Sequence, residues 1–201
     1  MKLLLTSTGF TNPRIGDFFV NLLNKPLSEV KVIFIPTASR SKEELYYVEE
    51  SKNELIQRGI KTSNLSIYNL DKRLSYNAVK DYDVIYVCGG NTFYLTLKIR
   101  EDGFDKVIKR LVKEDKLYLG VSAGSVLAGP NIDIASPYDP NDVKLKDWTG
   151  LGLTDIIVSP HYTDNDKEVV KKFKKEEKYK VIPLTDNQAL FISDKEKKII
   201  E

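Results

Sequence analysis

Runs of apolar residues alternate with helix-like segments along most of this chain, and this alternation restricts the possible folds more than any other feature. Each run is short and continuously apolar, as in a strand that is buried on both faces of a sheet. We expect such strands at residues 3–7, 30–35, 65–68, 83–88 and 116–119. Buried strands that are separated by helices predict an α/β fold, with a mostly parallel sheet and helices on both faces.

The segments between these strands have the helical period, because apolar residues recur at every third or fourth position. In the second of these segments we expect Leu45, Val48, Leu55 and Ile56 to face inward. Helices are predicted to begin at Pro13, after Ser41 and at Thr92, and to include residues 104–112.

Composition adds few further restrictions. The 201 residues are 41% hydrophobic and 30% charged, as in an ordinary globular protein, and we expect one domain over residues 1–201. The net charge of +2 gives no reason to expect nucleic acid or an anionic membrane as a partner. A single cysteine suits a reducing compartment, and we find neither a signal peptide nor a membrane-spanning segment, so we expect a cytoplasmic protein.

The strand at residues 116–119 ends in small residues on both sides of a serine. Gly120, Ser122 and Gly124 match the pattern G-x-S-x-G, in which glycines allow a sharp turn that exposes the serine hydroxyl. Ser122 is therefore a candidate nucleophile. The alternative is a glycine-bounded turn in which the serine only caps a helix.

A serine nucleophile needs a base, and the chain has one histidine, His161. His161 follows the apolar run at residues 156–158, so we expect it at the end of a strand, where the sites of α/β proteins are built. The alternative is a hydrogen-bonded structural histidine. The same edge of the sheet should carry Ser122.

A glycine pair after the strand at residues 83–88 is the second chemical signal. The N–H of Gly90 and that of Ala123, which follows the candidate nucleophile, are the expected donors of an oxyanion hole. We expect the flanking Gly89 and Asn91 to contact substrate, although a simple tight turn is an alternative. Cys88, which closes the apolar strand, is predicted to be a small core residue.

The last third of the chain is less regular. Strands are predicted at residues 180–184 and 188–192, joined by a turn at 185–187 as an antiparallel hairpin, and followed by a charged tail from residue 195. We expect Asp164 and Asp166 to cap a helix. No cluster of metal ligands is evident, and no cofactor is expected.

Four motifs, taken in chain order, resemble those of the peptidase E (aspartyl dipeptidase) family, to which cyanophycinase is distantly similar. They are Ile35-Pro36-Thr37-Ala38-Ser39, Cys88-Gly89-Gly90-Asn91-Thr92, Gly120-Val121-Ser122-Ala123-Gly124-Ser125 and Ser159-Pro160-His161-Tyr162. The resemblance implies a class I glutamine amidotransferase-like, three-layer α/β fold and a serine peptidase that needs no metal. It implies Ser122 as nucleophile and His161 as base, and the acid of the triad aligns best with Asp186.

One departure from the family's pattern concerns the substrate. Members that cleave after an N-terminal aspartate have arginine after the histidine, whereas here residues 163–167 are mainly acidic. A carboxylate side chain would need a cation such as Arg40 or Lys167, so the side-chain preference for a small peptide stays open.

Two other functions stay open as well. One is an amidase or other non-peptidase hydrolase on the same scaffold, and the other is a catalytically silent binding protein. The sequence makes no prediction of oligomeric state.

Overall fold

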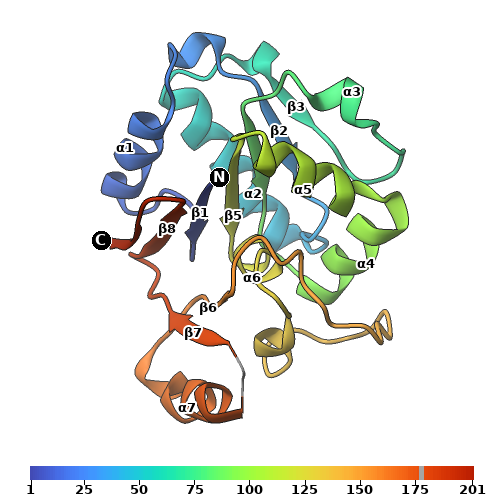
Figure 1. Cartoon of the computed structure of the whole chain (residues 1–201), viewed down its shortest axis with the longest axis vertical. Helices are drawn as coiled ribbons and strands as arrows, with labels where there is room; N and C mark the ends of the chain where they lie inside the picture. Colours follow the sequence, from blue (N-terminus) through green and yellow to red (C-terminus); the bar gives the residue numbers. More distant parts are fainter. Residues whose placement is uncertain (177–178) are drawn as a thin grey trace.

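A mixed sheet of seven strands forms the centre of the protein (Figure 1). The computed structural model describes residues 1–176 and 179–201. The strand order is β3-β2-β4-β5-β1-β8-β9, with the first five strands parallel and the last two antiparallel to their neighbours. These strands are β1 (Lys2–Thr6), β2 (Val32–Ile35), β3 (Leu65–Ile67), β4 (Val84–Val87), β5 (Leu117–Val121), β8 (Ala189–Ser193) and β9 (Lys197–Ile200). The predicted mostly parallel α/β fold is confirmed.

Helices connect the parallel strands. They are α1 (Pro13–Leu22), α2 (Lys42–Gln57), α3 (Tyr76–Val79), α4 (Thr92–Asp102), α5 (Phe104–Lys113), α6 (Ala123–Leu127) and α7 (Lys167–Glu176). Short 3₁₀ turns lie at Leu27–Glu29, Thr62–Asn64, Asp133–Ala135 and Asp164–Asp166. In the part of the chain that the structure describes, no helix has the length and apolar character needed to cross a membrane.

Side chains near the helix starts explain where the helices begin. The Asn12 side chain accepts a hydrogen bond from the N–H of Arg14, and Pro13 occupies the first turn, where its missing N–H costs nothing. Ser41 and Glu44 form a capping box at α2, each side chain accepting from the other residue's backbone N–H.

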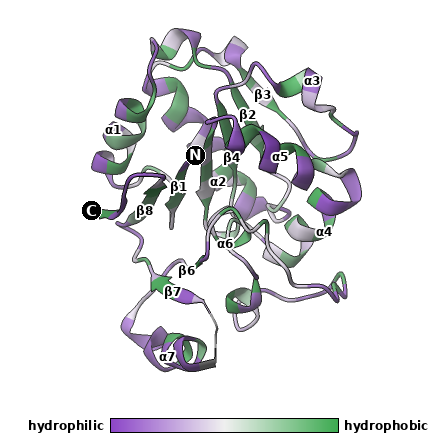
Figure 2. Cartoon of the chain, viewed as in Figure 1, coloured by the Kyte–Doolittle hydropathy of each residue, from purple (hydrophilic) through white to green (hydrophobic). Residues whose placement is uncertain are grey.

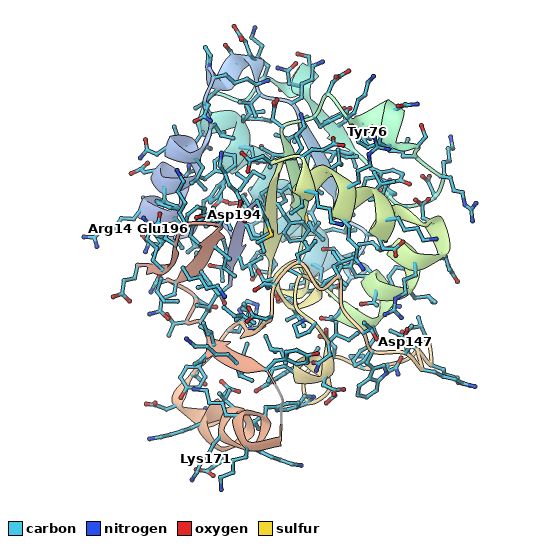
Figure 3. All side chains as sticks on the ribbon, in the orientation of Figure 1. Arg14, Tyr76, Asp147, Lys171, Asp194 and Glu196 are labelled. Carbon is cyan, nitrogen blue, oxygen red and sulfur yellow. The ribbon has the colours of Figure 1, made fainter. Side chains whose placement is uncertain are left out.

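The sheet separates two apolar cores, because alternate residues of a strand point to opposite faces. Leu4 of β1 faces α1 and α2, where Phe19 and Leu55 are completely buried. Leu3 faces the other way, toward Phe104 of α5 and the other buried apolar residues of α4, α5 and α6. Figure 2 shows the hydrophobic strands at the centre and hydrophilic residues on the outer faces of the helices. Charged side chains such as Lys171 project around the periphery in Figure 3.

The C-terminal part differs from the predicted hairpin. The strand β7 (Lys180–Pro183) pairs in parallel with β6 (Ile156–Ser159) in a separate two-stranded sheet. The next strand, β8, pairs antiparallel with β1 and places Leu190 and Ile192 in the core. The segment predicted as a charged tail contains β9, which pairs with β8. The prediction was wrong because the free edge of β1 offers a strand partner that is distant in sequence.

A second correction concerns α2. Val48 and Leu55 are buried, but Leu45 is 48% exposed and Ile56 is only partly buried. At about 100° per residue, Val48 and Leu55 lie on nearly the same line of the helix, whereas Leu45 and Ile56 are about 60–100° away. The buried face of α2 is therefore narrower than the sequence pattern predicted.

Candidate active site

Ser122 lies directly after β5, in a backbone conformation that is strained for a residue with a side chain. Its φ is 47° and its ψ is −109°, and a positive φ is rare for a serine. The turn requires its two glycines, because a Cβ on Gly120 would lie 2.6 Å from the carbonyl oxygen of Gly124, and one on Gly124 would lie 2.3 Å from that of Val87. The Ser125 hydroxyl braces the turn by donating to the carbonyl oxygens of Thr6 and Gly120, at 2.7 and 2.8 Å.

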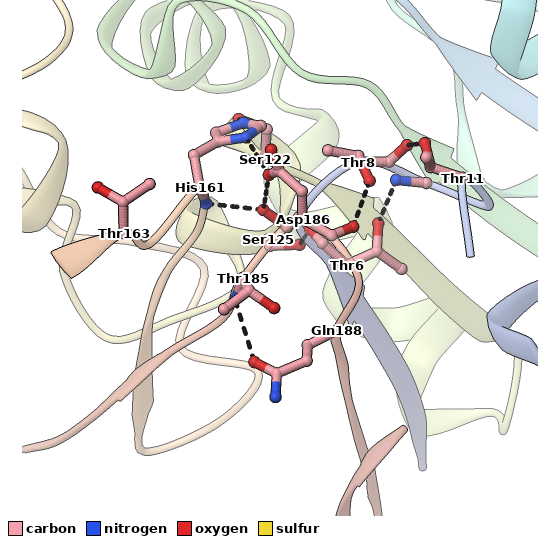
Figure 4. A network of polar contacts seen from close by, with 12 residues as sticks. Thr6, Thr8, Thr11, Ser122, Ser125, His161, Thr163, Thr185, Asp186 and Gln188 are labelled. Carbon is pink, nitrogen blue, oxygen red and sulfur yellow. Dashed lines mark hydrogen bonds and ion pairs between the residues drawn. The ribbon is translucent and has the colours of Figure 1, made fainter. Parts of the chain in front are cut away.

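His161 follows β6 and reaches Ser122 from another element of the fold (Figure 4). Its Nε2 lies 2.9 Å from Ser122 Oγ, and its Nδ1 lies 2.7 Å from Oδ1 of Asp186, in the turn between β7 and β8. An ionised carboxylate can only accept, so Nδ1 carries the proton and Nε2 is free to accept from the serine hydroxyl. The three predicted residues are thus in hydrogen-bonding contact.

Ser7 joins this network, although the sequence did not single it out. Its Oγ accepts from the backbone N–H of His161 at 2.7 Å and donates to Oδ1 of Asp186 at 3.0 Å. It therefore fixes the backbone of His161, which has a positive φ of 55°, to the carboxylate. Ser7 follows the carboxyl end of β1, which lies beside β5, and residues in such a position often belong to the site of an α/β protein. Ser7 could be recognised in this way only once the strand order was known.

The other acidic residues near His161 in sequence are used elsewhere. Oδ2 of Asp166 accepts from the backbone N–H and the hydroxyl of Thr163, both at 2.8 Å, and its Oδ1 accepts from Tyr138. Asp164 begins the 3₁₀ turn that leads into α7. Both residues are at the helix entry where capping was predicted, and the carboxylate that meets the imidazole is that of Asp186.

The glycine loop after β4 lies against the serine. A Cβ on Gly89 would be 3.1 Å from the Cβ of Ser122, and one on Gly90, whose φ is +125°, would be 2.2 Å from the carbonyl oxygen of Ala38. Within the described residues, no acceptor takes the N–H of Gly90 or of Ala123. Both predicted oxyanion donors are consequently free, with Gly89 beside the hydroxyl.

The side chain of Asn91 is hydrogen-bonded within the protein through both its oxygen and its nitrogen. Its side chain accepts from the N–H of Tyr94 at 2.8 Å and donates to the carbonyl oxygen of Pro140 at 2.8 Å. Its own N–H donates to Ala38, and the residue is 5% exposed. Asn91 therefore caps α4 and fastens the loop, and these contacts do not support the expected contact with substrate.

Two cavities flank the Ser122 hydroxyl. The larger, of about 370 Å³, reaches from the Ser122, His161 and Asp186 side chains along α2. The smaller, of about 170 Å³, adjoins Ala123 and is walled largely by apolar side chains and Tyr138. A peptide bond over the hydroxyl would thus have space for a residue on each side.

Cys88 contributes a thiol, a second type of nucleophile, to the lining of the larger cavity. It is 3% exposed, and burial raises the pKa of its thiol well above the ordinary value, so the reactive thiolate is disfavoured. Among residues 1–176 and 179–201, no group of three or more His, Cys, Asp or Glu side chains could hold a metal ion.

Comparison with known proteins shows the family to which this sequence is similar. Residues 3–200 match the model of peptidase family S51. The chain is 34% identical to an uncharacterized peptidase of Listeria monocytogenes, over 98% of this chain and 97% of that protein. It is 33% identical over 133 residues to peptidase E of Shewanella amazonensis, which covers 66% of this chain and 54% of that protein.

A solved structure shares the fold over almost its whole length. It comes from Listeria monocytogenes EGD-e and is provisionally assigned as a peptidase E. The TM-score is 0.79 at 32% identity, over 98% of this chain and 96% of that one. The resemblance drawn from the four sequence motifs is confirmed.

Proposed function

The chain belongs to peptidase family S51, and we propose that it hydrolyses short peptides with Ser122 as nucleophile, His161 as general base and Asp186 as the acid that orients the base. The supporting observation is the pair of contacts on the imidazole, 2.9 Å to Ser122 Oγ and 2.7 Å to Asp186 Oδ1. These distances are within the reach that proton transfer requires.

The first half of the reaction forms an acyl-enzyme. Ser122 Oγ attacks the scissile carbonyl carbon while its proton moves to Nε2 of His161. The resulting oxyanion accepts hydrogen bonds from the N–H groups of Gly90 and Ala123, which have no other acceptor among the described residues. As the C–N bond breaks, the imidazolium returns the proton to the leaving amine, so no net charge is created.

The second half reverses these roles. Water loses a proton to Nε2 of His161 and attacks the ester carbonyl, and the imidazolium then protonates Ser122 Oγ as the acid product leaves. In both halves Asp186 keeps the Nδ1 proton in place and stabilises the imidazolium.

Active-site labelling tests this assignment. A fluorophosphonate should label the protein at one residue, and peptide mapping should identify it as Ser122. The variant Ser122→Ala should lose both labelling and hydrolysis, whereas Cys88→Ala, which removes the thiol from the same cavity, should keep both. Label on another residue, or full activity of Ser122→Ala, would contradict the proposal.

A substrate panel tests the reaction class. Dipeptides, simple esters and primary amides of the same amino acids should be compared by kcat/KM. We expect cleavage of dipeptides to be the most efficient on this scale. Efficient cleavage of primary amides with inert dipeptides would instead favour an amidase on the same scaffold.

A further inference from the structure

The wall of the larger cavity that α2 forms is acidic. Glu44, Glu50 and Glu54 all line it, together with Tyr47, Val48 and Ser51 of the same helix. No lysine or arginine is among its lining residues within the described chain. The cavity also contains Ser122 and His161, so these carboxylates belong to the space that a substrate residue would occupy.

Arginines act on two of these carboxylates, Arg40 on Glu44 and Arg58 on Glu54, but neither arginine forms an ion pair with its carboxylate. No described cation lies within 4.0 Å of Glu44, Glu50 or Glu54 in an ion pair. Glu44 and Glu54 accept backbone N–H groups, which keep each side chain in place. Burial raises the pKa of Glu54, and the charge of Arg58 and the N–H of Phe10 oppose this shift in part.

Two of the nearby cations are occupied elsewhere, whereas the third, Arg58, stacks on the ring of Phe10 and acts on Glu54 without an ion pair. Arg40, a candidate for binding a substrate carboxylate, forms an ion pair with Asp142 at 3.0 Å and stacks on the ring of Tyr94. Lys52 of α2 pairs with Glu49 at 2.8 Å. Neither Arg40 nor Lys52 lines the larger cavity. The cavity therefore has the wrong charge to receive an aspartate side chain.

We infer that this acidic cavity binds the N-terminal residue of a short peptide and favours lysine or arginine there over aspartate. The inference rests on the proposed peptidase function and specifies its substrate. A dipeptide has an ammonium at one end and a carboxylate at the other, and the field of the glutamates attracts the first and repels the second. The N-terminal residue thus lies on the α2 side, and the leaving residue lies toward the smaller cavity.

The remaining walls suit a long cationic side chain. Val48 gives an apolar surface for the methylene stem, and Tyr47, 61% exposed at the same cavity, offers a ring face to a guanidinium or ammonium. A volume of about 370 Å³ has room for one such residue. Glu50, which is exposed, and the more buried Glu54 are then the carboxylates that face the cation.

The test compares dipeptides that differ only in the first residue: Lys-Ala, Arg-Ala, Leu-Ala and Asp-Ala. We expect kcat/KM to be about tenfold higher for the first two than for Leu-Ala, and lowest for Asp-Ala, since each partly exposed charge contributes about 1.5- to 5-fold. The advantage should shrink as ionic strength is raised from about 0.01 to 0.5 M. N-acetylation should slow cleavage of every member.

Charge-neutralising variants identify the carboxylates. Glu50→Gln and Glu54→Gln keep the size of the side chain, and glutamine can still accept from Phe10 N–H as Glu54 does. Each should lower the preference for Lys-Ala over Leu-Ala about 1.5- to 5-fold. The matched control is Glu49→Gln, which removes the same charge from the same helix outside the cavity and should leave the preference unchanged.

The outcomes separate this inference from the proposed function. If dipeptides are cleaved but Asp-Ala is preferred, or if both glutamine variants keep the wild-type preference, the inference is wrong and the peptidase assignment stands. If no dipeptide is cleaved and Ser122 is not labelled by a fluorophosphonate, the proposed function is wrong, and the inference that rests on it is wrong as well. If Glu49→Gln also lowers the preference for Lys-Ala over Leu-Ala, the preference arises from the overall negative charge of α2. That result would contradict the assignment of Glu50 and Glu54 to a binding subsite.

Discussion

Replacing Asp186 by asparagine probes how the imidazole of His161 is held. Oδ1 of Asp186 receives two donors, the Nδ1–H of His161 and the hydroxyl of Ser7, at 2.7 and 3.0 Å. Ser7 uses its lone pair for the His161 N–H, so its own proton points to Asp186. An asparagine in this place keeps its carbonyl oxygen toward both donors. Its NH₂ group is itself a donor and cannot accept from the Nδ1–H of His161 or from the hydroxyl of Ser7. Asp186→Asn should therefore lose the charge but keep the tautomer.

The size of the effect follows from the lost attraction between carboxylate and imidazolium. Two unit charges about 4 Å apart attract by about 4 kcal/mol at an effective dielectric of 20 and by about 1 kcal/mol in water. The side chains of His161 and Asp186 are 51% and 58% exposed, so an intermediate value applies. A loss of about 2.7 kcal/mol lowers kcat roughly 10²-fold.

The hydroxyl of Ser7 limits how far kcat falls in Asp186→Asn. In the double variant Ser7→Ala/Asp186→Asn the amide is free to turn its NH₂ toward Nδ1, which would place the imidazole proton on Nε2. We expect kcat to fall by about 10⁴, the loss associated with the wrong tautomer. Ser7→Ala alone, which keeps the carboxylate, should cost about tenfold, the equivalent of one hydrogen bond.

The assay is steady-state hydrolysis of the best dipeptide by the wild type and the three variants, with thermal unfolding to show that each variant is folded. Asp186→Asn as impaired as the double variant would refute the argument that Ser7 holds the amide. Near-normal kcat in Asp186→Asn would refute the role of Asp186 itself.

Four further predictions concern single residues. His161→Ala should abolish nearly all turnover in a folded protein, and substantial residual hydrolysis would remove His161 as the base. Cys88→Ala should lower the unfolding free energy by about 1 kcal/mol in chemical denaturation and leave kcat unchanged; lost turnover would reassign the nucleophile. Gly90→Ala should impair both stability and kcat, because its Cβ would lie 2.2 Å from the carbonyl oxygen of Ala38 at a φ of +125°; an unchanged melting temperature and kcat would contradict this. Burial raises the pKa of Glu54 above 4.5, so the folded state holds this proton more tightly than the unfolded chain. The stability this proton adds is present below pH 4.5 and lost as pH rises through the raised pKa, so Glu54→Gln should flatten that part of the pH–stability curve.

Much of the fold was predictable because it depends on local patterns. Continuous apolar runs and helical periods extend over only a few residues, and they correctly placed the strands β1 to β5 and the helices α1, α2, α4 and α5. The predicted hairpin failed because strand pairing is not local. The segments at β7 and β8 both contain apolar residues, and their partners, β6 and β1, lie elsewhere in the chain.

The site divides in the same way. The sequence was sufficient to propose Ser122 and His161, because the elbow glycines and a single histidine are visible without any contact. The choice of Asp186 over Asp164 and Asp166 relied on an expected reach across the strand ends, and the folded chain has that contact at 2.7 Å.

Other features of the site could not be predicted from the sequence. Ser7, the acidic wall of α2 and the commitment of Asn91 to helix capping depend on which strands are neighbours and on how α2 lies across them. A residue's type and its near neighbours determine its chemistry and its local backbone. Which distant side chains it meets depends on the packing of the whole sheet, because that packing brings together strand ends that are more than a hundred residues apart.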